Sequence, residues 1–150
     1  MKNSILKLFV IGLTMAPSAW AAPGAATLPI VRVYKDPACG CCTAWIKHMQ
    51  ANGFQVVAHD TNDVAVHKRR LGVPFGIGSC HTAEVGGYVV EGHVPARDIR
   101  RLLNERPRVR GLAVPGMPTG SPGMEEGGRK DAFDVLRIER DGSTRAYARY

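Results

Sequence analysis

The sequence places three of its four cysteines within four residues, and no other feature constrains the fold and chemistry so strongly. The three are Cys39, Cys41 and Cys42, and the fourth, Cys80, lies far along the chain. A set of structural disulfides is disfavoured, because pairing Cys41 with either neighbour closes a very small, strained ring. Cys39 and Cys42 have the Cys-x-x-Cys spacing of thiol–disulfide exchange, but the third thiol between them would compete for the mixed disulfide. We therefore favour a soft-metal site over a redox dithiol or a structural role.

The first 21 residues have the pattern of a cleaved export signal. Lys2 and Lys7 precede an apolar run of about nine residues, which is too short to span a bilayer as a helix. Residues 19–21 then give the small-x-small pattern of a signal-peptidase site. Cleavage there predicts a mature protein in the bacterial periplasm, an oxidising compartment, with no membrane span.

Composition and charge exclude several classes of protein. Hydrophobic residues make up 45% of the chain and charged residues 22%, which excludes a long disordered tail, a coiled-coil fibre and a polytopic membrane protein. The net charge of +7 falls to +5 when the signal and its two lysines are removed. We expect no nucleic-acid partner, because export separates the protein from the nucleic acid of the cell. The positive net charge is attributed to a solvated face or to weak attraction to anionic surfaces.

Hydrophobic periodicity predicts one α/β domain over residues 30–150, after a short tether at residues 22–29. The expected elements are a strand at 30–34, a helix at 41–52, a strand at 54–58, a helix capped by Asp63 that runs to Leu71, strands at 82–85 and 88–91, and a helix opened by Pro95 and ended by Pro107. This β-α-β-α-β-β-α order is that of the thioredoxin fold. Thioredoxin-like proteins carry their Cys-x-x-Cys pair between the first strand and the first helix, where Cys39 and Cys42 stand here.

The C-terminal part is expected to extend this domain. Residues 111–128 are rich in Gly and Pro and contain two methionines, which predicts a long loop. Residues 134–138 and 144–147 flank Asp141-Gly142 and predict a final β-hairpin.

The donor atoms near the cysteines are soft ones. The start of a helix favours thiolates, because its free N–H groups and dipole stabilise negative charge. In a thioredoxin-like fold the segment before the third strand packs beside the active loop, so Cys80 is expected to become a fourth thiolate, with His81 adjoining it. Thiolates and thioethers select Cu(I), although Zn(II) also accepts thiolates, and Met117 is the better thioether candidate in the loop.

The other histidines and Met124 have possible roles other than metal binding. His59 and His67 stand among charged residues and are expected to face solvent. The sequence leaves His48, His93 and Met124 as further ligand candidates. The alternative for His48 is packing against the protein, for His93 it is capping a helix, and for Met124 it is exposure to solvent.

A longer set of motifs resembles the CopG family of copper-resistance proteins. The matching segments are residues 34–37, 39–42, 45, 48–49, 72–74, 79–83, 87–88, 91–96, 112–118 and 120–125. The resemblance implies a periplasmic thioredoxin-like protein that binds copper through its cysteines and acts in copper resistance. The implied ligands are Cys39, Cys41, Cys42 and Cys80, with His81 and Met117 as additions, and the four sulfurs suit a cluster of several copper ions.

The predicted function is therefore periplasmic copper binding, with copper held as Cu(I) and either sequestered, passed to other copper-handling proteins or cycled to Cu(II). The first alternative is a periplasmic thiol–disulfide oxidoreductase that uses Cys39 and Cys42. A zinc- or disulfide-stabilised interaction domain is the other.

Overall fold

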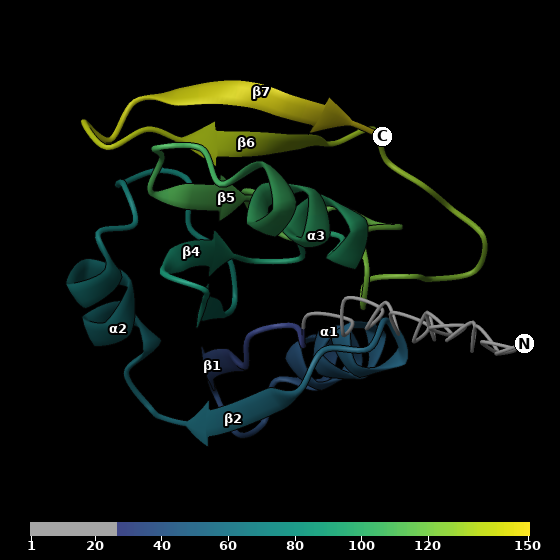
Figure 1. The fold of residues 1–150 in the computed structure, drawn as a ribbon. Helices are drawn as coiled ribbons and strands as arrows, with labels where there is room; N and C mark the ends of the chain where they lie inside the picture. Colours follow the sequence, from purple (N-terminus) through teal and green to yellow (C-terminus); the bar gives the residue numbers. More distant parts are fainter. Residues whose placement is uncertain (1–26) are drawn as a thin grey trace, which may run out of the picture.

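The computed structural model describes residues 27–150, so the signal expected at residues 1–21 and most of the tether expected at 22–29 lie outside the described part. The described chain forms a seven-stranded mixed sheet and three helices (Figure 1). The strands are β1 (Val31–Lys35), β2 (Val56–Asp60), β3 (Thr82–Val85), β4 (Tyr88–Glu91), β5 (Gly111–Ala113), β6 (Asp134–Ile138) and β7 (Thr144–Arg149). The helices are α1 (Gly40–Ala51), α2 (Val64–Leu71) and α3 (Ala96–Glu105). The protein therefore has the mixed α/β architecture that the sequence predicts.

The sheet register brings the two cysteine-bearing segments together. The strands lie in the order β2-β1-β3-β4-β5-β6-β7, with β1 parallel to β2 and antiparallel to β3. Tyr34, near the end of β1, pairs with Thr82, the first residue of β3. The chain leaves β1 toward Cys39 and enters β3 just after Cys80. Pairing of these two strand ends therefore places Cys80 at the same end of the sheet as the other three cysteines.

Alternation along β1 distributes side chains to the two faces of the sheet. Val31 and Val33 are fully buried and join Trp45 of α1 and Ile99 of α3 in one hydrophobic cluster. Tyr34 points to the opposite face, where its ring stacks on His67 of α2 with the centroids 4.0 Å apart. The helices α1 and α3 thus cover one face and α2 covers the other.

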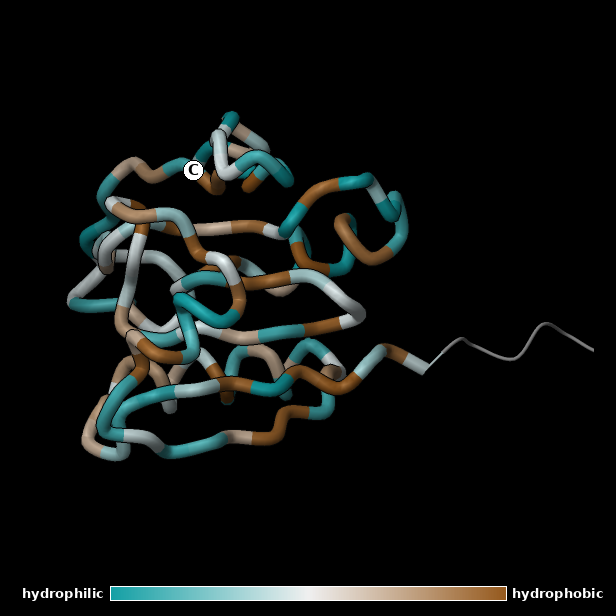
Figure 2. The backbone as a smooth tube through the Cα atoms, turned by 90° about the vertical axis from the view of Figure 1, so that its left-hand side faces the viewer, coloured by the Kyte–Doolittle hydropathy of each residue, from teal (hydrophilic) through white to brown (hydrophobic). Residues whose placement is uncertain are grey.

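Hydrophobic and hydrophilic residues are interleaved along the described chain rather than gathered in one continuous apolar stretch (Figure 2). Among residues 27–150, no helix combines the length and the apolar character that a bilayer span requires.

One strand was not predicted. Residues 111–113 fall in the expected Gly/Pro loop, but they form β5, which pairs parallel to β4 and antiparallel to β6. This short strand joins the predicted hairpin of β6 and β7 to the rest of the sheet. A side chain at position 111 would collide with the backbone of Val89, so the glycine allows the two strands to approach. The pairing depends on contacts distant in sequence, which local patterns do not report.

The ends of α2 follow from local sequence, whereas the start of α3 depends on a residue distant in sequence. Asp63 caps α2 as predicted, accepting the Val66 N–H through its side chain at 3.1 Å, and Gly72 closes the helix in the left-handed conformation. Helix α3 follows Pro95, which offers no side-chain cap. Its first N–H, that of Ala96, instead donates to Nε2 of His48 on α1 at 3.1 Å.

Acid should weaken the bond between His48 and α3. Burial lowers the pKa of His48, against a smaller opposing effect of Glu125, so the folded state favours the neutral ring that can accept this bond. A histidine with a depressed folded pKa stabilises the protein above its unfolded pKa of about 6.5 and loses this contribution as the pH falls. We expect urea unfolding to show a smaller loss of stability below about pH 6.5 in His48→Gln than in the parent. Equal losses in the two proteins would contradict the capping role.

Candidate metal centre

The cysteine cluster forms the start of helix α1. Cys39 is the N-cap residue, and its sulfur accepts the backbone N–H of Cys42 at 3.3 Å. Cys42 is fully buried beneath the first turn, whereas Cys41 is half-buried on the side of that turn. A disulfide joins Cys39 to Cys42, and Cys41 and Cys80 are free thiols in the described chain. The Cys-x-x-Cys pair is thus oxidised, which is the pairing that the redox alternative anticipates.

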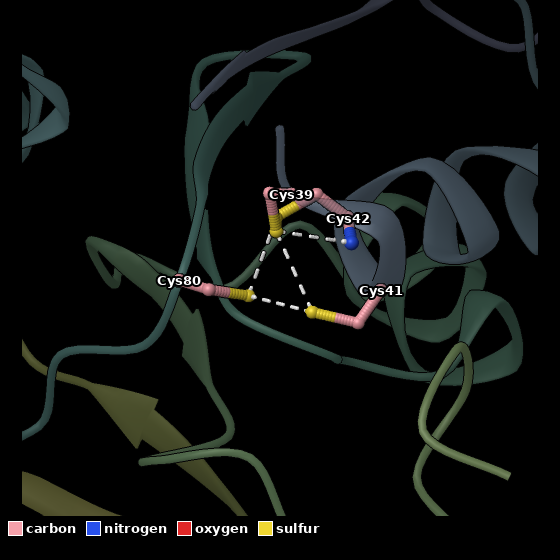
Figure 3. Close-up of side chains that lie close together, drawn as sticks. All are labelled: Cys39, Cys41, Cys42 and Cys80. Atoms are coloured by element: carbon pink, nitrogen blue, oxygen red, sulfur yellow. Dashed lines mark hydrogen bonds between the residues drawn. A yellow bond between two sulfur atoms is a disulfide. The ribbon is translucent and has the colours of Figure 1, made fainter. Parts of the chain in front are cut away.

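Cys80 completes a group of four sulfurs (Figure 3). Its Sγ lies 3.4 Å from that of Cys42 and 3.7 Å from that of Cys41. The Sγ atoms of Cys39 and Cys41 are 3.5 Å apart. All four sulfurs lie within 4.8 Å of one another, close enough to share one metal ion or to bridge several.

Two imidazoles extend the group on the side of Cys80. The Cys80 Sγ lies 3.1 Å from Nε2 of His93 and 3.4 Å from Nδ1 of His81, and both histidines are fully buried. The ring atom Nδ1 of His93 lies 2.8 Å from the carbonyl oxygen of Pro122. A carbonyl can only accept, so this bond fixes the proton on Nδ1 and turns the lone pair of Nε2 toward Cys80. Cys80, His81 and His93 form a second group of metal donors, whose ligand atoms lie within 4.8 Å of one another.

His81 has an atom whose hydrogen-bonding capacity is unused. Its Nε2 is buried and has no hydrogen-bond partner among the described residues. The ring packs against Trp45 with the centroids 4.5 Å apart, which holds it beside the cysteines. Buried polar atoms normally have partners, so this unpaired Nε2 is an exception among the described residues.

The electrostatics of the site favour neutral ligands when no metal is bound. Burial, together with the nearby Cys41, raises the pKa of the Cys80 thiol to about 12. Burial also lowers the pKa of His81 and of His93, so both rings are neutral at pH 7. A cation can bind by replacing the Cys80 proton and accepting the imidazole lone pairs, and this binding is favoured at higher pH.

The methionine-bearing loop lines a cavity together with Cys41. A cavity of about 410 Å³ is lined by Gly40, Cys41, Ala44, Met117, Gly123, Met124, Glu125 and Glu126. Met117 is 53% exposed, so its thioether stands at the rim of this cavity. Cys41 is the cysteine that the cavity reaches.

The loop is held against α1 by the absence of a side chain at position 123. A Cβ on Gly123 would lie 2.6 Å from the Trp45 backbone nitrogen and 2.8 Å from the Cys41 carbonyl oxygen, atoms that cannot rotate away. We expect Gly123→Ala to destabilise the protein by about 1–3 kcal/mol in urea unfolding, through strain at positive φ and this close approach.

Gly142→Ala is a matched control for this effect. Gly142 has the same φ of 87°, but nothing lies within 4 Å of a Cβ placed there. Its substitution therefore reports the cost of the backbone conformation alone. A loss at Gly123 no larger than that at Gly142 would contradict close packing of the loop on α1.

The remaining histidines lie elsewhere. His48 caps α3, as described above. His59 is exposed, as expected, and stacks on Tyr34 with the centroids 5.1 Å apart. The expectation that His67 faces solvent is wrong, because the residue is half-buried, its Nδ1 is buried and its ring stacks on Tyr34. Of the candidates left open by the sequence, only His93 has a ring nitrogen in contact with a cysteine sulfur.

Four cysteine sulfurs with two adjoining imidazoles define a protein with a site suited to a soft metal ion. Comparison with known proteins agrees. Residues 77–124 match a family described as "Protein of unknown function, DUF411". Two solved structures, described as "Copper resistance protein copG- Form 2" and "Copper resistance protein copG- Form 1", each share 51% identity with the chain at a TM-score of 0.78. In each case the match covers 82% of this chain and 98% of the other. None of the curated proteins matches. The chain belongs to the CopG family of copper resistance proteins.

Proposed function

We propose that this protein binds copper as Cu(I) through Cys39, Cys41, Cys42 and Cys80 and thereby acts in copper resistance. The observation that carries the proposal is the convergence of four sulfurs within 4.8 Å of one another. Sulfur is a soft ligand that binds Cu(I) well, whereas harder metal ions prefer carboxylate and water ligands. Held in such a site, Cu(I) is withheld from redox reactions in solution.

His81 and His93 supply the nitrogen donors of the proposed site. Both rings lie against Cys80, and the bond to Pro122 leaves Nε2 of His93 free to bind. Six donors exceed the number that one Cu(I) ion uses, so we propose that the site holds more than one ion, bridged by thiolates. Met117, at the rim of the cavity that reaches Cys41, is placed to hand copper to the thiols rather than to hold it among them.

The Cys39–Cys42 disulfide adds a redox step to this proposal. Exchange with a dithiol reductant, which is itself oxidised to a disulfide, converts the Cys39–Cys42 disulfide to two thiols and so brings the number of free thiols from two to four. In the oxidising direction, two Cu(II) ions would each accept one electron from the Cys39–Cys42 dithiol, giving two Cu(I) ions, the disulfide and two protons. Such cycling is the enzymatic activity that the geometry supports, since the reacting sulfurs and the metal donors are the same atoms.

The cellular setting of the proposal rests on the sequence. We propose cleavage of the signal after residue 21, a tether over residues 22–29, and a single domain over residues 30–150 that works in the periplasm and exchanges copper with other copper-handling proteins there. We also propose that β1 to α3 form a thioredoxin-like unit. Its support is the element order β-α-β-α-β-β-α with the Cys-x-x-Cys pair at the start of α1.

An anaerobic metal titration of the reduced protein tests the proposal. We expect Cu(I) to bind in more than one equivalent and to displace Zn(II), because thiolate sites prefer the softer ion. Failure to bind Cu(I), or binding that survives replacement of both Cys39 and Cys42 by serine without loss of affinity, would refute it. Stabilisation by Zn(II) alone would instead support a structural zinc site.

A thiol–disulfide oxidoreductase is the second candidate, and the oxidised Cys39–Cys42 pair at a helix start favours it. Reduction of insulin by the metal-free, reduced protein tests this function. Turnover that Cys41→Ser leaves unchanged would support it, because Cys41 lies outside the disulfide. Absence of turnover would leave copper binding as the function.

A further inference from the structure

The backbone around Cys80 is held by a buried ion pair on the face of the sheet that α2 covers. Cys80 lies between α2 and β3, in a segment without helix or strand. The N–H of Ser79 donates to Oε1 of Glu91 at 2.6 Å. The Nζ of Lys68 donates to the carbonyl oxygen of His81 at 3.2 Å. Both residues adjacent to Cys80 are thus bonded to the same pair, since Lys68 also donates to Oε1 of Glu91.

This ion pair has an unusual position for charged side chains. Glu91, at the end of β4, is fully buried, and the side chain of Lys68 on α2 is only 18% exposed. Burial of two charges is costly, and hydrophobic replacements often leave a fold equally stable. The pair is therefore better explained by the backbone groups it bonds than by its contribution to the stability of the fold.

Other bonds fix the general course of the segment without the ion pair. The Gly116 N–H donates to the carbonyl of Gly78 at 3.1 Å, and the Gly92 N–H donates to the carbonyl of His81 at 3.1 Å. The Ser79 hydroxyl donates to the carbonyl of Gly116 at 2.5 Å. None of these bonds uses Lys68 or Glu91, so loss of Lys68 should shift Cys80 rather than unfold the segment.

We propose that Lys68 and Glu91 are positioning residues that set the Cys80 sulfur against the cysteines of α1. This role deepens the proposed copper-binding function and rests on it for its purpose, but its geometry is testable without metal. Neither side chain is among the sulfur and imidazole donors. They act through the backbone of Ser79 and His81.

Disulfide formation between Cys41 and Cys80 measures this positioning in the absence of metal. Their sulfurs lie 3.7 Å apart, so they should cross-link rapidly in a Cys39→Ser, Cys42→Ala background, where no other cysteine competes. The oxidant is diamide, which takes up the two hydrogens of the thiols, and the product is quantified by mass spectrometry. We expect Lys68→Met to slow this reaction by about tenfold or more, because displacing one of two reacting atoms by about 1 Å can cost up to about 100-fold in rate.

A second variant guards against a fold that does not tolerate an unpaired Glu91. The double variant Lys68→Met with Glu91→Gln removes both charges but keeps an oxygen that accepts the Ser79 N–H, so we expect it to fold, as seen by near-UV circular dichroism, and to cross-link slowly. Arg70→Met is the matched control: Arg70 lies on the same helix and pairs with Glu84 at 3.7 Å. It should cross-link at the parent rate. A double variant that fails to fold, or that cross-links as fast as the control, would overturn the proposal.

The copper arm of the experiment separates this proposal from the proposed function. With all four cysteines present and reduced, Lys68→Met and the double variant should bind Cu(I) about 10–100-fold more weakly than Arg70→Met. If the parent binds no Cu(I), the proposed function fails while the cross-linking result still decides the positioning role. If the parent binds Cu(I) and both variants bind it equally well, the positioning role fails alone.

Discussion

Reduction of the Cys39–Cys42 disulfide is expected to strengthen Cu(I) binding by at least about 100-fold, because loss of a direct ligand costs more than the 10–100-fold attributed to outer partners. The oxidised protein offers only the thiols of Cys41 and Cys80, whose sulfurs lie 3.7 Å apart. Reduction adds the thiols of Cys42 and Cys39, whose sulfurs in the oxidised structure lie 3.4 Å from that of Cys80 and 3.5 Å from that of Cys41. Competition with a chromophoric Cu(I) chelator, under anaerobic conditions and after removal of the reductant, measures the two affinities.

A variant without the disulfide provides the control. Cys39→Ser with Cys42→Ser should bind Cu(I) weakly whether or not it has been treated with reductant, because it lacks the two sulfurs that reduction releases. If the oxidised and reduced parent proteins bind Cu(I) equally, or if the double variant still responds to reductant, the disulfide does not control the site.

Cys80→Ser should have the second large effect. We expect it to lower the Cu(I) affinity of the reduced protein by at least about tenfold, because losing a direct ligand should cost at least as much as losing a residue that only orients a ligand. The Cys80 sulfur contacts both the cysteines of α1 and the two imidazoles, so it joins the two halves of the proposed site. Its replacement should leave thermal unfolding of the oxidised protein almost unchanged, because Cys80 takes part in no disulfide.

The neighbouring serine serves as the comparison for Cys80. Ser79→Ala removes the hydroxyl that donates to the Gly116 carbonyl and lies 4.0 Å from the Cys80 sulfur, but it keeps all four cysteines. It should bind Cu(I) far more tightly than Cys80→Ser does. Equal affinities in these two variants, or parent-like affinity in Cys80→Ser, would mean that Cys80 is not a ligand.

Local patterns were sufficient to predict most of the elements that carry the site. The β-branched run of β1, the apolar spacing of α1 and the Asp63 cap of α2 act over a few residues, and each appears within one or two residues of its expected bounds. Strand β2 begins two residues later than expected, at Val56. The position of Cys80 beside α1 was inferred from the element order, and the pairing of Tyr34 with Thr82 provides the physical link.

Contacts distant in sequence were the ones that could not be predicted. Strand β5 exists because β4 and β6 pair with it, and His93 meets Cys80 because the Pro122 carbonyl orients its ring. The ion pair of Lys68 and Glu91 joins residues 23 positions apart, and neither residue lies in a pattern that distinguishes it from an ordinary surface charge. The disulfide was underestimated, because the spacing argument treated the third thiol as a competitor without knowing where its sulfur points.

Copper-edge X-ray absorption of the reduced protein loaded anaerobically with Cu(I) tests the central claim most directly. The four converging sulfurs predict a first coordination shell dominated by sulfur, with a smaller nitrogen contribution that His93→Ala reduces, and scattering between copper ions if thiolates bridge them. A shell of nitrogen and oxygen without sulfur, in protein shown to have four reduced thiols, would contradict copper binding by the cysteine cluster.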